Sequence, residues 1–132
     1  MNKGRQGPAA AGAALGFLGV GLGAFGAHGL EGLLEGVAEA AQRTEWWETA
    51  AHYHLLHAVA IVAVAAALRG RPGLLAATWC FILGTAVFSG TLYAMALGAP
   101  HWFGAITPIG GLLLMAGWAV AGLGAWRSAP AE

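Results

Sequence analysis

The chain has 132 residues, of which 58% are hydrophobic and 9% charged, and its formal net charge at pH 7 is zero. Soluble chains carry about 25% charged residues, so the composition excludes an ordinary soluble domain. The neutral balance also gives no reason to expect a nucleic-acid partner. The length suffices for one transmembrane domain over residues 1–132 and no second domain. A single cysteine, Cys80, excludes an internal disulfide.

Four apolar runs follow one another along the chain, each near the roughly 20 residues that a helix needs to cross a bilayer. Because lipid offers the backbone no hydrogen-bond partners, each run is predicted to be a helix. The predicted spans cover residues 8–27, 49–68, 74–97 and 106–126. The first run is longer than the usual apolar core of a signal peptide, so we expect it to be a retained span. The sequence therefore predicts an all-α fold, an integral membrane four-helix bundle.

The segment between the first two spans, about residues 30–47, has a helical pattern of its own. Apolar residues recur at helical spacing, while Glu31, Glu35 and Glu39 form a polar stripe. Trp46 and Trp47 follow, at the depth where indole rings favour the membrane interface. We predict an amphipathic interfacial helix here, which either connects two spans or acts as a lid over the end of the bundle.

Small residues form stripes on three of the predicted spans. Their spacings of mostly three, four and seven place each set on one helical face. The stripes are Gly12, Gly16, Gly19, Gly23 and Gly26 in the first span, Gly90, Ala94 and Gly98 in the third, and Gly110, Gly117, Ala121 and Gly124 in the fourth. Membrane helices pack through such residues. The stripes predict close packing inside the bundle or, alternatively, against another subunit.

Positive charges are divided unevenly between the two sides of the predicted membrane. The side with both termini and the second loop carries Lys3, Arg5, Arg69, Arg71 and Arg127, whereas the opposite side carries only Arg43. Short cytoplasmic loops are enriched in Lys and Arg. Both termini are therefore predicted to be cytoplasmic.

All five histidines fall toward the opposite, outer side: His28, His52, His54, His57 and His101. His54 and His57 are three apart and share a helical face, whereas His52 points nearly the other way. Two imidazoles at this spacing suggest one hypothesis, a metal or haem site of His54 and His57 that is completed by His28, or alternatively by His101 or a glutamate. The signal is weaker than a HExxH motif, because the remaining ligands come from other segments.

His57 lies inside the second span, where an ionisable group usually faces the bundle interior and has a partner. In the third span Ser89 and Tyr93 are four apart on one face, at similar depth from the outer side. We expect His57, Ser89 and Tyr93 to converge, with His28 and Thr107 nearer the surface. A structural hydrogen-bond network and a ligand site both fit this pattern.

Four short motifs occur in order along the chain: Gly-Ala-Phe-Gly-Ala-His-Gly-Leu at 23–30, Tyr53 with His57-Ala58, Phe-Ser-Gly-Thr-Leu-Tyr at 88–93, and Thr-Pro-Ile-Gly-Gly at 107–111. They resemble the family of small membrane proteins that includes bacterial YgdD-type proteins and eukaryotic transmembrane protein 256. The resemblance covers nearly the whole chain. It implies a four-span protein of the bacterial inner membrane and no particular activity. It also places His28 and His57 on motif positions, whereas His52 and His54 stand where relatives more often have Arg and Gln.

The central parts of the spans contain no Asp, Glu, Lys or Arg, which argues against coupled transport by a monomer. No catalytic residues are predicted, and the sequence does not identify a cofactor. The leading hypothesis is an accessory or scaffold subunit, or a protein that binds a small lipophile in a polar outer-leaflet pocket. The polar residues expected there are His28, Tyr53, His57, Ser89, Tyr93 and Thr107. A redox-associated metal- or haem-binding protein and an oligomeric channel or transporter are the alternatives. The expected partners are membrane lipid and either a larger membrane complex or further copies of the chain.

Overall fold

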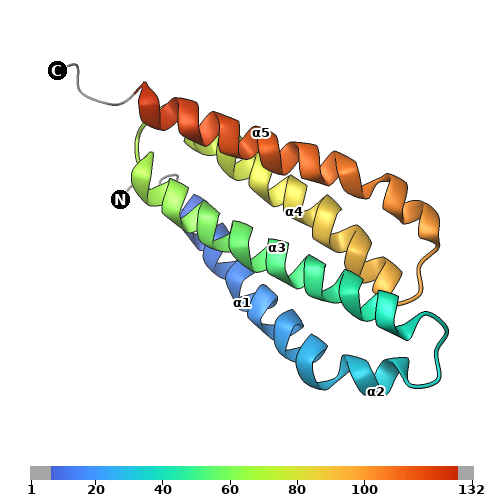
Figure 1. The fold of residues 1–132 in the computed structure, drawn as a ribbon. Helices are drawn as coiled ribbons and strands as arrows, with labels where there is room; N and C mark the ends of the chain where they lie inside the picture. The colour runs from blue at the N-terminus through green and yellow to red at the C-terminus, as the bar shows by residue number, and fades with distance from the viewer. Residues whose placement is uncertain (1–6, 128–132) are drawn as a thin grey trace.

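The computed structural model describes residues 7–127, and this part of the chain contains helices and no strands. The long helices are α1 (Gly7–His28), α3 (Ala40–Ala67), α4 (Leu74–Ala96) and α5 (Thr107–Trp126), and the short ones are α2 (Leu30–Leu34) and the 3-10 helix η2 (His101–Ala105) (Figure 1). Four helices, α5 being counted together with η2, are long and apolar enough to cross a membrane. The predicted all-α fold with four membrane-length helices is confirmed.

The long helices lie side by side in the order α1, α3, α4, α5, each antiparallel to the next (Figure 1). α1 packs along α3, α3 along α4, and α4 along α5. α1 therefore begins and α5 finishes at the same end of the molecule, which we call the terminal end. The opposite end, where α1 and α4 finish and α3 and α5 begin, is called the polar end.

Three of the predicted spans agree with α1, α4 and α5 to within one residue at each boundary. The second differs, because α3 begins at Ala40 instead of residue 49. Its 28 residues extend for about 42 Å, more than the roughly 30 Å of hydrocarbon in a bilayer. The polar end of α3 therefore has the length to project beyond the apolar layer.

The predicted interfacial helix over residues 30–47 is wrong as a single element. α2 ends at Leu34, and residues from Ala40 onward already belong to α3. The break lies between them, where Gly36 has φ +70° and Glu39 has φ +61°. A right-handed helix requires negative φ, so the chain turns here and the apolar pattern divides between two helices.

Trp47 joins three helices at the polar end. Its ring is 3% exposed, and its Nε1–H donates to the carbonyl of Leu22 in α1 at 2.9 Å. The ring centroids of Phe25 and Tyr93 lie 5.2 Å and 4.6 Å away, and Gly26 leaves the space that the indole occupies. Trp47 therefore packs inside the bundle, between α1 and α4, whereas the sequence suggested contact with the membrane interface.

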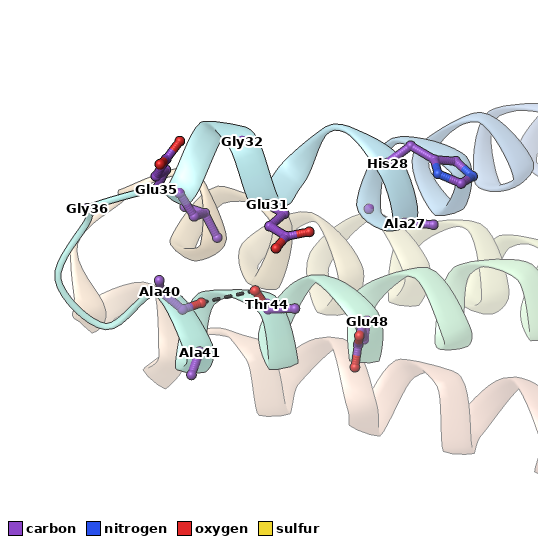
Figure 2. Close-up of a pocket in the computed structure, with 12 residues that line it drawn as sticks. Ala27, His28, Glu31, Gly32, Glu35, Gly36, Ala40, Ala41, Thr44 and Glu48 are labelled. Carbon is purple, nitrogen blue, oxygen red and sulfur yellow. Dashed lines mark hydrogen bonds between the residues drawn. The ribbon is translucent and has the colours of Figure 1, made fainter.

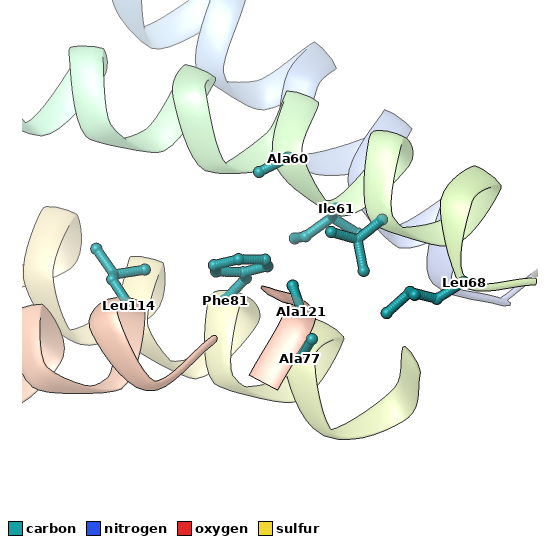
Figure 3. Packing of buried hydrophobic residues seen from close by; sticks show 8 residues of the cluster. Ala60, Ile61, Leu68, Ala77, Phe81, Leu114 and Ala121 are labelled. Carbon is teal, nitrogen blue, oxygen red and sulfur yellow. The ribbon is translucent and has the colours of Figure 1, made fainter. Parts of the chain in front are cut away.

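Phe81 of α4 stands at the centre of the main hydrophobic cluster and is fully buried. Figure 3 shows its ring between Ile61 of α3 and Leu114 and Ala121 of α5. A Cβ at Gly117 would overlap the edge of this ring. The missing side chain at position 117 is therefore what allows α5 to approach α4 at this level.

Two series of glycines at intervals of seven residues make close contacts between helices. Cβ atoms added at Gly12, Gly19 and Gly26 would overlap side chains of α3. Cβ atoms added at Gly110 and Gly117 would crowd α4, and one at Gly124 would crowd the turn between α3 and α4. Two helical turns span about seven residues, so each set lies on one face. The predicted glycine packing is confirmed for these residues. Gly23 and Gly90 instead face open space.

Gly110 makes the contact that is hardest to relieve, because its neighbour is the backbone of Phe88. We predict that Gly110→Ala lowers the free energy of unfolding by about 1–3 kcal/mol, since the helices must separate to admit a Cβ. Thermal unfolding of the purified protein in detergent, followed by circular dichroism, measures this loss. Gly122→Ala is the matched control, because position 122 has open space and alanine favours the helix. Equal Tm values for the two variants would contradict the packing argument.

Candidate functional site

A groove of about 560 Å³ lies between α3 and α5, on the half of α5 nearer the polar end. α3 and α5 both pack on α4, and Phe88 of α4 lines the gap between them. Gly111 in the α5 wall has no side chain to fill the space, and its nearest neighbour is the Phe88 ring. The further lining residues are His52, Tyr53, Leu56, His57, Pro108, Leu112, Leu114, Met115 and Trp118. The groove is thus mainly apolar, with its few polar groups concentrated on α3.

His57 sits at the inner side of this groove and is 3% exposed. Its Nδ1 lies 2.8 Å from the carbonyl oxygen of Tyr53, one turn earlier on α3. A carbonyl only accepts hydrogen bonds, so Nδ1 must carry the proton. The indole Nε1–H of Trp118 donates to Nε2 at 3.2 Å, and an indole only donates. These two partners together define a neutral imidazole, protonated on Nδ1, with both nitrogens satisfied.

Aromatic rings surround His57. The Tyr53 ring stacks on the imidazole with a centroid distance of 5.9 Å and an interplanar angle of 17°. Tyr53 also contacts Phe88 at 4.5 Å, and Trp118 meets the imidazole edge-on at 6.2 Å. Phe81 packs against both His57 and Trp118, with centroid distances of 5.5 Å and 5.2 Å. The groove therefore has flat aromatic walls near its most polar residue.

Tyr53 is 38% exposed, and its hydroxyl has no hydrogen-bond partner within residues 7–127. His52 lies beside it, with a centroid distance of 6.0 Å between the rings. The structure thus places His52, Tyr53 and His57 along one groove. This differs from the expected grouping, in which His54 accompanied His57 and His52 pointed elsewhere.

His54 and Tyr93 meet on another side of α3. The Tyr93 hydroxyl lies 3.5 Å from Nδ1 of His54, and His54 contacts α1 where Gly19 leaves room. Nε2 of His54 is buried without a hydrogen-bond partner among the described residues. Tyr93 also packs on Trp47. These residues belong to the junction of α1, α3 and α4 and do not line the groove.

The remaining hydroxyls of the predicted network bind neighbouring helices. Ser89 donates to the carbonyl of Ala50 at 2.8 Å, which links α4 to α3. Thr107 lies 2.7 Å from the hydroxyl of Thr91, which links the start of α5 to α4. In the part of the chain that the structure describes, neither Ser89 nor Tyr93 hydrogen-bonds His57. The structure brings Tyr53 and His57 together and gives Ser89, Tyr93 and Thr107 separate partners.

His28 is exposed and lines a second, open cleft of about 930 Å³ beneath α2. Figure 2 shows Glu31 pointing toward Thr44, while Glu35 and Glu48 point away from the gap. The carboxylates therefore do not converge. No group of three or more His, Cys, Asp or Glu side chains within residues 7–127 is arranged to hold a metal ion. The suggested ligands His28, His54 and His57 lie in three different surroundings.

Of the eleven residues that line the groove, only Tyr53 and His57 were among the predicted site residues. Phe88 and Trp118 are the two missed residues whose rings pack against Tyr53 and His57. Both lie within motifs or apolar runs of the sequence. Trp118 lies inside α5, whereas the other tryptophan of this helix, Trp126, is its last residue. An indole N–H inside a span needs a hydrogen-bond acceptor. This requirement indicates from the sequence alone that Trp118 has a polar partner. Helical periodicity does not show which helix carries the acceptor.

Four membrane-length helices, packed through glycines and carrying an aromatic groove with one buried histidine, define a multi-pass membrane protein. A family model described as "Protein of unknown function (DUF423)" matches residues 22–111. The chain belongs to this family. No solved structure matches it.

Curated relatives support the same assignment. A UPF0382 membrane protein of Staphylococcus haemolyticus is 43% identical over 101 residues, covering 75% of this chain and 78% of the relative. A UPF0382 membrane protein of Haemophilus influenzae is 40% identical over 114 residues, covering 86% and 88%. The UPF0382 inner membrane protein YgdD of Escherichia coli K12 is 38% identical over 118 residues, covering 85% and 83%. The resemblance inferred from the motifs is confirmed.

Proposed function

We propose that this membrane protein binds one small amphipathic lipophile in the groove between α3 and α5. The observation that carries the proposal is His57, a neutral imidazole held at the inner side of a groove whose walls are otherwise mainly apolar. An ionisable residue inside a span is a functional candidate by default. The groove gives it access to a ligand from the bilayer.

The dimensions of the groove support this function. Small-molecule sites commonly enclose about 300–1,000 Å³ and combine apolar walls with a few placed polar groups, and this groove measures about 560 Å³. Leu112 and Met115 on its α5 wall are 66% and 69% exposed, so in a membrane they face lipid. A lipophile therefore enters sideways, with its apolar part along α5 and its polar head toward α3.

Binding fits the described side chains better than catalysis. His57 has both nitrogens engaged, so as a general base it would first have to release a partner. The other polar groups of the groove, the imidazole of His52 and the hydroxyl of Tyr53, do not form a nucleophile–base–acid arrangement with it. We expect the protein to hold a ligand without converting it.

Photolabelling with benzophenone, an apolar aromatic probe that inserts into C–H bonds beside sulfur, tests the groove. We predict saturable labelling of Met115 in the protein reconstituted in nanodiscs, measured by peptide mass spectrometry. Gly111→Leu should reduce this labelling by about tenfold, as expected when filling the site costs about 1.4 kcal/mol of binding free energy. A Cβ added at position 111 would make only ordinary contact with the Phe88 ring, and we expect the further atoms of leucine to extend into the groove.

The matched control is Gly122→Leu, which adds the same side chain on α5 at a position with open space. Its Met115 labelling should equal that of the wild type. Labelling of Met115 that does not saturate, or that is equal in Gly111→Leu and Gly122→Leu, would exclude a specific site in this groove.

We further propose that the protein lies in the bacterial inner membrane with both termini in the cytoplasm. The support is the distribution of Lys and Arg: Arg69, Arg71 and Arg127 lie at the terminal end and Arg43 at the polar end, while Lys3 and Arg5 precede α1 in the sequence. A relative named as an inner membrane protein points to the same membrane. In this orientation the cleft beneath α2, which is lined by Glu31, Glu35 and Glu48, faces outward. The end of the groove that is closer to the polar end faces outward as well.

Reporter fusions in a bacterial host test the orientation. Alkaline phosphatase fused after residue 132 should be inactive, because it folds only outside the cytoplasm, and green fluorescent protein at the same place should fluoresce. Phosphatase inserted in the turn at Gly36 should be active. The reverse pattern would show that the termini are external.

A further inference from the structure

The hydrogen bond between Trp118 and His57 closes the inner side of the groove, and its chemistry selects the ligand. This inference rests on the proposed function, because it names the class of lipophile that the same groove accepts. His57 is 3% exposed, whereas Trp118, which donates to it, is 49% exposed. The indole is therefore packed on one side and free on the other.

Nε2 is the nitrogen of His57 that a ligand can reach. Nδ1 bonds the carbonyl of Tyr53 one turn earlier on the same helix, and the Tyr53 ring is stacked against the imidazole. Nε2 bonds a side chain of another helix, α5. A ligand head that takes over the acceptor Nε2 of His57 therefore enters between the indole of Trp118 and the imidazole.

Separating these two rings leaves one donor and one acceptor facing each other. The indole N–H can only donate, and Nε2 of this tautomer can only accept. A hydroxyl inserted between them accepts from Trp118 and donates to His57, so every polar group keeps a partner. A carbonyl or an ether oxygen only accepts, and it would leave Nε2 buried without a donor, which is costly in an apolar site.

The surrounding rings indicate what carries the hydroxyl. Tyr53, Phe88 and Trp118 line the groove together with the imidazole, and flat rings pair favourably with such walls. We infer that the groove takes a lipophile with a phenol-like head, whose hydroxyl enters between Trp118 and His57 while its hydrocarbon tail lies along α5.

Competition against benzophenone labelling of Met115 tests this selectivity. The competitors are 4-nonylphenol and its methyl ether 4-nonylanisole, which share ring and tail and differ in the hydroxyl proton. For the wild type in nanodiscs, the half-inhibitory concentration of the phenol should be about tenfold below that of the ether, the effect of one hydrogen bond in a buried site. The membrane partitioning of the two competitors is the same for every variant, so comparison among variants isolates the site.

Two variants locate the origin of the preference. Trp118→Phe removes the indole donor and leaves Nε2 without a partner, so the preference for the phenol should persist or increase. The double variant Trp118→Phe with His57→Leu replaces both partners by apolar groups, which avoids an orphaned polar atom. In it the two competitors should become equal. Circular dichroism verifies that both variants keep the helical content of the wild type.

The outcomes separate the two proposals. Equal competition by phenol and ether in the wild type would overturn the hydroxyl selectivity and leave the groove as a lipophile site. A preference that survives in the double variant would also overturn it, because the hydroxyl would then bind elsewhere. Failure of both competitors, together with labelling unaffected by Gly111→Leu, would remove the proposed function itself.

Discussion

A polar atom that a membrane helix turns inward is costly without a partner inside the protein, because lipid supplies none. His57 has such a partner at both nitrogens, and much of the site follows from these two hydrogen bonds. The carbonyl of Tyr53 on the same helix determines that Nδ1 carries the proton. Nε2 must then receive a hydrogen bond from another helix, and Trp118, 61 residues further along the chain, donates it. The hydrogen bond that joins α3 to α5 therefore requires that Nε2 of His57 carries no proton.

The packing of α4 makes that position possible. Gly110 lets α5 rest directly on the backbone of Phe88, and Gly117 admits the ring of Phe81. Phe81 in turn contacts both His57 and Trp118. The hydrophobic core thus packs directly against the candidate site, since Phe81 contacts His57 and Leu114 belongs to both the core and the groove lining. Because α3 and α5 each pack on α4, the space between α3 and α5 forms the groove.

Much of the fold could be predicted from the sequence, because apolar runs of membrane length report directly on helices that must satisfy their own backbone. The break between α2 and α3 could not, since the left-handed conformation of Glu39 leaves no trace in an amphipathic pattern. For the site, the burial of His57 followed from its depth in the span, but its partner did not. Ser89 and Tyr93 had suitable groups and suitable depth, yet the rotation of α4 directs Ser89 to a backbone carbonyl of α3 and Tyr93 toward His54. Which helix faces which is a property of tertiary packing, and one sequence's periodicity does not contain it.

His57 is a neutral imidazole that carries its proton on Nδ1 and accepts a hydrogen bond at Nε2. Nitrogen-15 NMR of histidine-labelled protein in lipid bilayers, with His57→Asn used to assign the signal, measures this directly. The structure predicts a protonated Nδ1 and an unprotonated Nε2, with Nε2 shifting toward the value of a free acceptor in Trp118→Phe. A proton on Nε2, or an Nε2 signal that Trp118→Phe leaves unchanged, would contradict the account.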